Sequence, residues 1–92
     1  MIAEDVATAN LLRRVEPEYP RAAREKRVQG SVVLNVIVGK DGSVEQLIPV
    51  TGDSELAPAA AAAVRQWRFK PLVRDGKPIE FESPITLNFA LP

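Results

Sequence analysis

The sequence predicts an α+β domain in which two helices pack on one face of a three-stranded antiparallel sheet with strand order 2-1-3. Residues 31–38 are almost continuously β-branched or aliphatic, which is typical of a strand with a neighbour on each side. Residues 79–91 alternate between apolar and polar side chains, as in a strand with one buried face. Between them, residues 56–67 are rich in alanine and carry apolar side chains at helical spacing.

The N-terminal part of the chain has a weaker pattern. Residues 1–14 show little helical periodicity, so we expect a mobile arm or a short helix, followed by one domain over residues 15–92. Residues 16–20, Glu-Pro-Glu-Tyr-Pro, must be extended before each proline, because a residue that precedes proline is kept out of the helical region. Pro20 suits the first position of a helix, and a short helix over residues 20–27 is expected.

The central strand leads into a hairpin. Asp41-Gly42 is a dipeptide that tolerates the positive φ angles of a tight turn, and residues 44–50 then return antiparallel to the first strand. Pro49 has no amide hydrogen for a ladder, so this second strand is expected at an edge of the sheet or with a bulge near its end. Asp41 and Asp75 each precede glycine and are interpreted as turn residues rather than metal ligands.

The alanine-rich helix is expected to begin after Ser54 and to end at Pro71, which cannot continue it. Its apolar face includes the only tryptophan of the chain. We expect Trp67 to fill the core rather than to touch a partner, because a small domain needs the apolar area of this side chain. The residues on that face are Leu56, Ala60, Ala63, Val64 and Trp67.

The last strand is expected at the sheet edge opposite the hairpin. In residues 79–91 the large apolar side chains have odd numbers, so one face is buried and the other is in water. Pro84 interrupts the ladder and is typical of an edge strand. The other face of the sheet is expected to carry Val33, Ile37 and Leu47, covered either by the N-terminal arm or by a second copy of the chain, so a homodimer is one possibility.

Composition excludes several classes of function. The chain contains no cysteine and no histidine, so it lacks thiolate metal ligands, the Ser-His-Asp and Cys-His nucleophile systems and the most common general base. We therefore expect no enzyme, no cofactor and no metal site. Twelve basic residues balance twelve acidic ones, which argues against a nucleic-acid partner. The sequence has no apolar run of eighteen residues, and its first fifteen positions carry several charges, so we expect neither a spanning helix nor a signal peptide in it.

Five short motifs occur in order along residues 15–92. They are Glu16-Pro17-Glu18-Tyr19-Pro20, Gly30-Ser31-Val32-Val33-Leu34, Asp41-Gly42 with Val44, Ala63-Val64-Arg65-Gln66-Trp67-Arg68-Phe69-Lys70-Pro71, and Leu87-Asn88-Phe89. Each motif alone is weakly specific. Together, at these spacings, they resemble the C-terminal domain of the TonB energy-transducer family over most of the chain.

That resemblance implies a function in transport across the outer membrane. In the family, this domain is the periplasmic end of a protein that is anchored in the inner membrane and joined to its anchor by a long proline-rich spacer. The domain binds the TonB box, a short extended segment at the periplasmic face of outer-membrane transporters, and their plug. An ExbB/ExbD-type motor in the inner membrane supplies energy from the proton-motive force. This chain carries neither anchor nor spacer, so we expect it to be the binding end, in the periplasm.

The expected partner site is the edge of the last strand. An unpaired edge offers backbone donors and acceptors with which an extended peptide can form a further strand. The expected residues of this edge are Ile85, Thr86, Leu87, Asn88, Phe89, Ala90 and Leu91. The resemblance adds the stretch before the first helix, which flanks the docked peptide in the family, at Glu16, Pro17, Glu18 and Tyr19. Better-known members carry Gln where this chain has Glu16 and Glu18, and Arg where it has Ala22, so the sequence of the partner stays open.

Two other functions stay open. The same fold can serve as a periplasmic interaction or dimerisation module of another envelope protein, for example a sensor, with the edge strand paired with itself or with a fixed partner. A carboxylate-based hydrolase is the other, and the missing His and Cys disfavour it. An anchor and proline-rich spacer in the parent protein would favour the transducer, whereas a catalytic or sensory domain upstream would favour the module.

Overall fold

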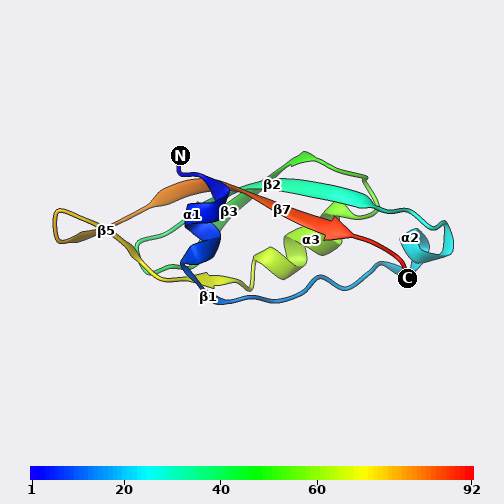
Figure 1. The fold of residues 1–92 in the computed structure, drawn as a ribbon, viewed down its shortest axis with the longest axis horizontal. Helices are drawn as coiled ribbons and strands as arrows, with labels where there is room; N and C mark the ends of the chain where they lie inside the picture. The colour runs from blue at the N-terminus through cyan, green and yellow to red at the C-terminus, as the bar shows by residue number, and fades with distance from the viewer.

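In the computed structural model, which describes residues 1–92, a three-stranded antiparallel sheet is the scaffold of the molecule (Figure 1). The central strand is β2 (Gly30–Val38), with β3 (Val44–Thr51) on one side and β7 (Phe81–Phe89) on the other. This arrangement confirms the predicted α+β class and the strand order 2-1-3. The register of β2 with β7 runs unbroken along both strands.

Three helices and two small sheets complete the chain. The helices are α1 (Glu4–Ala9), α2 (Arg21–Glu25) and α3 (Ala57–Val64), and none of them is long and apolar enough to cross a membrane. The strand β1 (Leu11–Arg13) pairs with β4 (Arg68–Phe69), and β5 (Leu72–Arg74) pairs with β6 (Lys77–Ile79). The molecule is elongated, with extents of 50 × 20 × 19 Å; the β5–β6 hairpin projects at one end and α2 lies at the other (Figure 1).

The hydrophobic core lies between α3 and the sheet. Side chains at alternate positions of β2 and β7 point into it, because successive side chains of a strand face opposite sides. The small residues of α3 let this helix lie close to the sheet, and larger aromatic side chains fill the space beyond its last turn. Buried members of the core include Val32, Leu34, Val36, Val38, Leu56, Ala60, Val64, Trp67, Phe69, Ile85 and Leu87.

For residues 1–14 the sequence predicts either a mobile arm or a short helix. The structure has α1 and β1 in this region. Ala7 of α1 is completely buried and belongs to the core. The backbone carbonyl of Asn10 accepts a 2.7 Å hydrogen bond from the amide of Lys70, which ties the end of α1 to the chain after β4. This region is therefore packed on the domain, and the division of the chain at residue 15 stays a prediction.

The alanine-rich helix is shorter than the sequence predicts. The predicted helix reaches Pro71, but α3 ends at Val64. Beyond it, the amide of Phe69 donates a 2.9 Å hydrogen bond to the carbonyl of Gly42 in the hairpin turn. This bond to a distant part of the chain begins β4 in place of further helix. Between α3 and β4, the amides of Gln66 and Trp67 bond to the carbonyls of Ala63 and Val64 in a tighter turn, and the side chain of Trp67 is 0% exposed.

The predicted last strand is also divided. The sequence predicts one strand over residues 79–91, but Glu80 separates β6 from β7, and β7 ends at Phe89. The turn between β5 and β6 has positive φ angles at Asp75 (52°) and Gly76 (77°), as a tight hairpin turn requires. The alternation of apolar residues continues through the break, so the pattern alone does not reveal it.

The edge strand β3 carries the predicted irregularities. Its register with β2 shifts twice, so Glu45 and Val50 have no partner residue on β2. The sequence position of Leu47 predicts that its side chain lies on the open face of the sheet, and this prediction is wrong. It lies opposite Val36 and packs against the core, because the bulge at Glu45 changes the face to which the following side chains point.

Candidate partner-binding site

The outer edge of β7 is the candidate site. In an antiparallel pair, the N–H and C=O of one residue both point to the partner strand, and those of the next residue both point away. The Thr86 amide and the Glu82 carbonyl bond to groups outside the β2–β7 pair, so even-numbered residues of β7 face away from β2. The outer edge therefore carries the backbone groups of Glu82, Pro84, Thr86 and Asn88.

Pro84 is compatible with this edge for a geometric reason. Proline has no amide hydrogen, and at an even-numbered position that hydrogen would point away from β2. The ladder between β2 and β7 therefore loses no bond, which explains how proline is accommodated in the middle of a nine-residue strand. On the C-terminal side of Pro84, the outer-edge donors within the strand are the amides of Thr86 and Asn88.

The predicted site residues within β7 separate into two groups. Ile85, Leu87 and Phe89 direct their backbone groups toward β2, and their side chains are at most 4% exposed. Thr86 and Asn88 present their backbone groups on the outer edge. A partner strand would form its hydrogen bonds with the second group, while the first group holds β7 in the sheet.

The last two predicted residues lie beyond the strand. Ala90 and Leu91 follow the end of β7 and do not extend the three-stranded sheet. The Leu91 amide instead donates a 2.9 Å hydrogen bond to the side-chain oxygen of Gln29, just before β2. The regular edge available to a partner is therefore shorter than the sequence predicts.

Part of the outer edge is already occupied by the N-terminal segment. The Ile2 amide donates a 2.8 Å hydrogen bond to the Glu82 carbonyl. The Glu4 carboxylate accepts two bonds, from the Thr86 amide at 2.6 Å and from the Thr86 hydroxyl at 2.8 Å. Sequence reasoning missed Ile2 and Glu4, because a contact between residues 82 positions apart leaves no local pattern.

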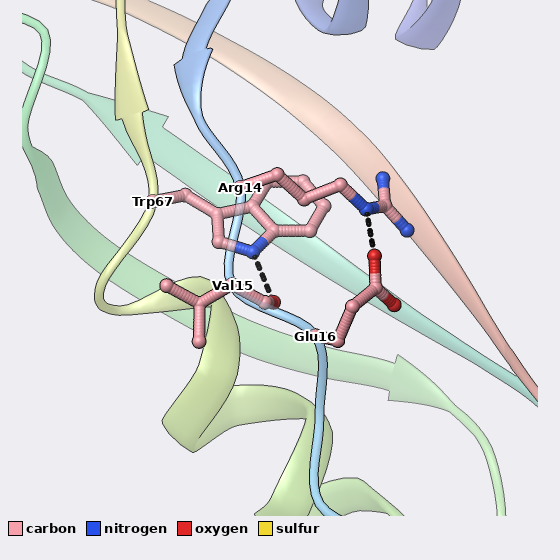
Figure 2. A network of polar contacts seen from close by, with 4 residues as sticks. All are labelled: Arg14, Val15, Glu16 and Trp67. Carbon is pink, nitrogen blue, oxygen red and sulfur yellow. Dashed lines mark hydrogen bonds and ion pairs between the residues drawn. The ribbon is translucent and has the colours of Figure 1, made fainter.

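The stretch before α2 is attached to the core through Trp67 (Figure 2). The indole Nε1–H donates a 2.8 Å hydrogen bond to the carbonyl of Val15. The Arg14 guanidinium lies 4.8 Å from the centroid of the indole, and its Nε pairs with the Glu16 carboxylate at 2.7 Å. That ion pair is exposed and contributes little by itself. The buried indole is therefore the group that sets the path of this stretch.

Tyr19 joins the same stretch to the end of β7. Its ring meets Phe89 edge to face, with the ring centroids 5.5 Å apart. Its hydroxyl donates a hydrogen bond to the carbonyl of Val28, in the loop between α2 and β2. Tyr19 thus links the stretch before α2 to the loop after α2 and to the end of β7.

The other predicted residues of this stretch lie nearer to α3. Glu16 and Glu18 are exposed and line a surface depression of about 500 Å³ together with residues of α3. Pro17 lies between them and is half-buried. Among the four predicted residues of the stretch, Tyr19 is therefore the one whose ring packs on β7.

Basic residues lie at the C-terminal end of β7. Arg24 and Arg27 line a depression of about 390 Å³ with residues 90–92. Lys26 is not part of this depression and pairs with Glu55 at 2.5 Å. The hydrogen bond to Glu55 and the negative charge of Glu55 raise the pKa of the Lys26 ammonium. The two arginines therefore place positive charge beside the end of the candidate edge, where an acidic partner group would be favoured.

Two exposed carboxyl groups in the hairpin regions have shifted pKa values. A hydrogen bond with Glu80, together with local burial and the charge of Glu80, raises the pKa of Glu45. Hydrogen bonds from the hydroxyl and amide of Ser43 lower the pKa of Asp41, as expected for a turn residue.

No group of three or more acidic side chains is placed to hold a metal ion.

The fold and the edge together define a class of protein: a small α+β domain whose last long strand forms one edge of its sheet. The family described as "Gram-negative bacterial TonB protein C-terminal" matches residues 15–91. The chain belongs to this family of TonB C-terminal domains, in agreement with the resemblance carried by its motifs.

Individual relatives agree with the assignment. The chain is 32% identical over 80 residues to Protein TonB of Vibrio cholerae and 33% identical over 87 residues to Protein tonB2 of Pseudomonas aeruginosa. These alignments cover 85% and 92% of the chain but 33% and 32% of the relatives, so the chain spans about a third of their length. The solution NMR structure of the Pseudomonas aeruginosa TonB CTD has the same fold. Its TM-score is 0.74, with 24% identity, over 88% of this chain and 84% of that one.

Proposed function

We propose that this domain is the periplasmic, partner-binding end of a TonB-type energy transducer. It pairs the outer edge of β7 with the TonB box of outer-membrane transporters and transmits energy from the proton-motive force for nutrient uptake. Membership of the TonB family supports the transducer. The proposed binding mode rests on one observation: the Thr86 amide and the Glu82 carbonyl point away from β2, on the outer edge of β7. An ExbB/ExbD-type inner-membrane motor would act through the rest of the parent protein.

Strand addition suits the transmission of force. Backbone hydrogen bonds to a partner strand form regardless of most side chains, and each contributes about 0.5–1.5 kcal/mol in water. Because β7 pairs with β2 over nine residues in unbroken register, a pull along the edge is shared by the whole ladder. The buried side chains of Ile85 and Leu87 connect that ladder to the core.

We further propose that residues 16–19 contact the partner at the C-terminal end of β7. Tyr19 packs on Phe89 there, so the stretch and the edge strand approach each other. Arg24 and Arg27 add positive charge at this end, which favours an acidic group on the transporter plug.

A titration of the ¹⁵N-labelled domain with a synthetic TonB-box peptide tests the binding mode. We expect the largest amide shifts at Thr86 and Asn88 and weaker shifts at residues 16–19. Two control peptides carry N-methyl groups on alternate backbone amides, in the two possible phases. The phase that blocks the amides facing β7 should abolish binding, and the other should not. Saturable shifts confined to a different surface would contradict the proposal.

A second function uses the same fold as a periplasmic interaction or dimerisation module of another envelope protein, such as a sensor. The observation in its favour is the apolar exposure of β3, where Ile48 is 54% and Val50 59% exposed. Sedimentation of the free domain separates the two functions. A transducer domain should remain monomeric and bind TonB-box peptide, whereas the module should form a concentration-dependent dimer with no affinity for the peptide.

A further inference from the structure

We propose that residues 2–4 are an internal occupant of the outer edge of β7 and compete with the partner strand for it. The inference rests on the proposed function, because it assigns a regulation to the same edge. Two hydrogen-bonding groups of that edge are in use: the Glu82 carbonyl is bonded to the Ile2 amide, and the Thr86 amide is bonded to the Glu4 carboxylate.

These contacts lie on the part of β7 that a partner strand needs. Pro84 offers no amide hydrogen, so the Thr86 amide is the first outer-edge donor on the C-terminal side of it. Glu4 takes that donor, and the Asn88 amide is the next one along the strand. A partner that pairs along the strand must therefore displace the Glu4 carboxylate.

The Glu4 contact is stronger than an ordinary contact at a sheet edge. A hydrogen bond from a backbone amide to an ionised carboxylate is charge-assisted and roughly twice as strong as a neutral one. The second carboxylate oxygen accepts from the Thr86 hydroxyl, so the two bonds reinforce each other. The backbone carbonyl of a partner strand is neutral, so its bond to the Thr86 amide is weaker than the bond from that amide to the Glu4 carboxylate. The peptide therefore binds less tightly than it would to an unoccupied edge.

The rest of the N-terminal region holds Glu4 in place. Ala7 is completely buried, and the Asn10 carbonyl is bonded to the Lys70 amide, so α1 is fixed to the core. Glu4 lies in the first turn of that helix. Release of the edge therefore requires only that Ile2 leaves the Glu82 carbonyl and that the Glu4 side chain turns away from Thr86, while Ala7 and the rest of α1 stay packed. The apparent affinity for a partner is then reduced by the fraction of molecules whose edge is free.

The same contact protects the free domain. An open strand edge can pair with another sheet, and covering it with a charged side chain prevents this. A partner that binds strongly enough to displace residues 2–4 gains access, whereas a weakly pairing strand does not.

The test compares Glu4→Ala with Asp5→Ala in the 92-residue chain, using anisotropy of a labelled TonB-box peptide. Asp5 is a matched control, since Asp5→Ala removes the same charge from the same turn, while the Asp5 carboxylate accepts from the neighbouring Val6 amide and not from β7. We expect Glu4→Ala to bind the peptide about tenfold more tightly than wild type, and Asp5→Ala to stay within about twofold.

Amide hydrogen exchange at Thr86 is a readout that needs no peptide. Loss of the carboxylate acceptor should accelerate this exchange severalfold in Glu4→Ala and leave it unchanged in Asp5→Ala. Glu4→Gln keeps the side-chain shape and one acceptor oxygen, so its affinity and exchange rate should lie between those of Glu4→Ala and wild type. It also replaces Glu4→Ala if the alanine variant fails to fold.

The outcomes separate the regulation from the proposed function. Equal peptide affinities for wild type, Glu4→Ala and Glu4→Gln, with peptide shifts at Thr86 in each, would overturn the competition and leave the function intact. Absence of peptide binding by all the proteins would overturn the function and the regulation together. Binding by Glu4→Ala that is tighter than that of wild type and Asp5→Ala would support both.

Discussion

The indole nitrogen of Trp67 donates a 2.8 Å hydrogen bond to the backbone carbonyl of Val15, across 52 positions of sequence. Trp67 is completely buried, which confirms that it fills the core. The bond also gives this side chain a second structural task. It fixes the start of the stretch that leads to α2, and that stretch carries Tyr19 to the end of β7.

We predict that Trp67→Phe lowers the free energy of unfolding by about 2–4 kcal/mol, because it leaves a cavity and removes the donor from the Val15 carbonyl. Urea denaturation measures this change. Arg14→Ala is the control, since Arg14 stacks on the same ring from a partly exposed position, and it should cost less than about 1 kcal/mol. Similar losses for the two variants would show that the buried indole has no special role.

We predict that Thr86→Pro folds but binds TonB-box peptide about tenfold more weakly when both proteins also carry Glu4→Ala, a background in which neither has the competing carboxylate. Its amide points away from β2, as that of Pro84 would, so the sheet loses no ladder bond while the partner loses a donor. Peptide titration and a thermal melt measure the two effects. Thr86→Val keeps the amide and should bind at least as well as wild type.

The contrasting variant is Leu87→Pro, at a residue that lies opposite Val32 with its backbone directed to β2. It should unfold the domain, because it removes a ladder donor and a buried side chain. A folded Thr86→Pro variant in the Glu4→Ala background that binds the peptide as tightly as Glu4→Ala alone would rule out pairing through the Thr86 amide.

We predict that Gly42→Ala destabilises the domain by roughly 3 kcal/mol or more. Gly42 has a φ of 86°, and a Cβ there would lie 1.9 Å from the carbonyl oxygen of Phe69, so the backbone would have to move. Gly76→Ala is a matched control, with a φ of 77° and nothing within 4 Å of the added atom, and should cost only about 1 kcal/mol. Chemical denaturation of both variants measures the difference, and equal losses would exclude the steric contact as the cause.

We predict that Glu45→Gln is at least as stable as wild type at pH 7. The hydrogen bond with Glu80 raises the pKa of Glu45 above its ordinary value of 4.5, so the native state binds more protons than the unfolded state. Glu45 therefore opposes folding above its raised pKa, and this effect disappears as the pH falls below 4.5. Denaturation curves at several pH values measure it. A Glu45→Gln variant that is less stable than wild type at neutral pH would contradict the assignment.

Much of the sheet can be predicted from the sequence because its signals are local. The β-branched run of β2 indicates a central strand, and the alternation along β7 shows which side chains face the core. Pro84 indicates an edge through its missing amide, and the structure confirms that it lies on the outer side of the sheet.

The candidate site is only partly visible in the same way. The sequence indicates the strand that carries it, but the separation of Thr86 and Asn88 from their buried neighbours depends on the pairing with β2. The end of the edge at Phe89 follows from the contact between Leu91 and Gln29, which belong to different segments. The face to which Leu47 points is set by a bulge, whose position is decided by both strands of a pair.

Strand order, the buried face of the sheet and the family of this protein follow from the sequence alone, since periodicity, proline positions and motif spacing are properties of short segments. The tertiary structure alone decided where α3 ends and what occupies the edge of β7. In both cases the deciding hydrogen bonds join distant residues, Phe69 to Gly42 and Thr86 to Glu4. Such bonds join segments that are brought together only by the packing of the whole core, so no local pattern encodes them.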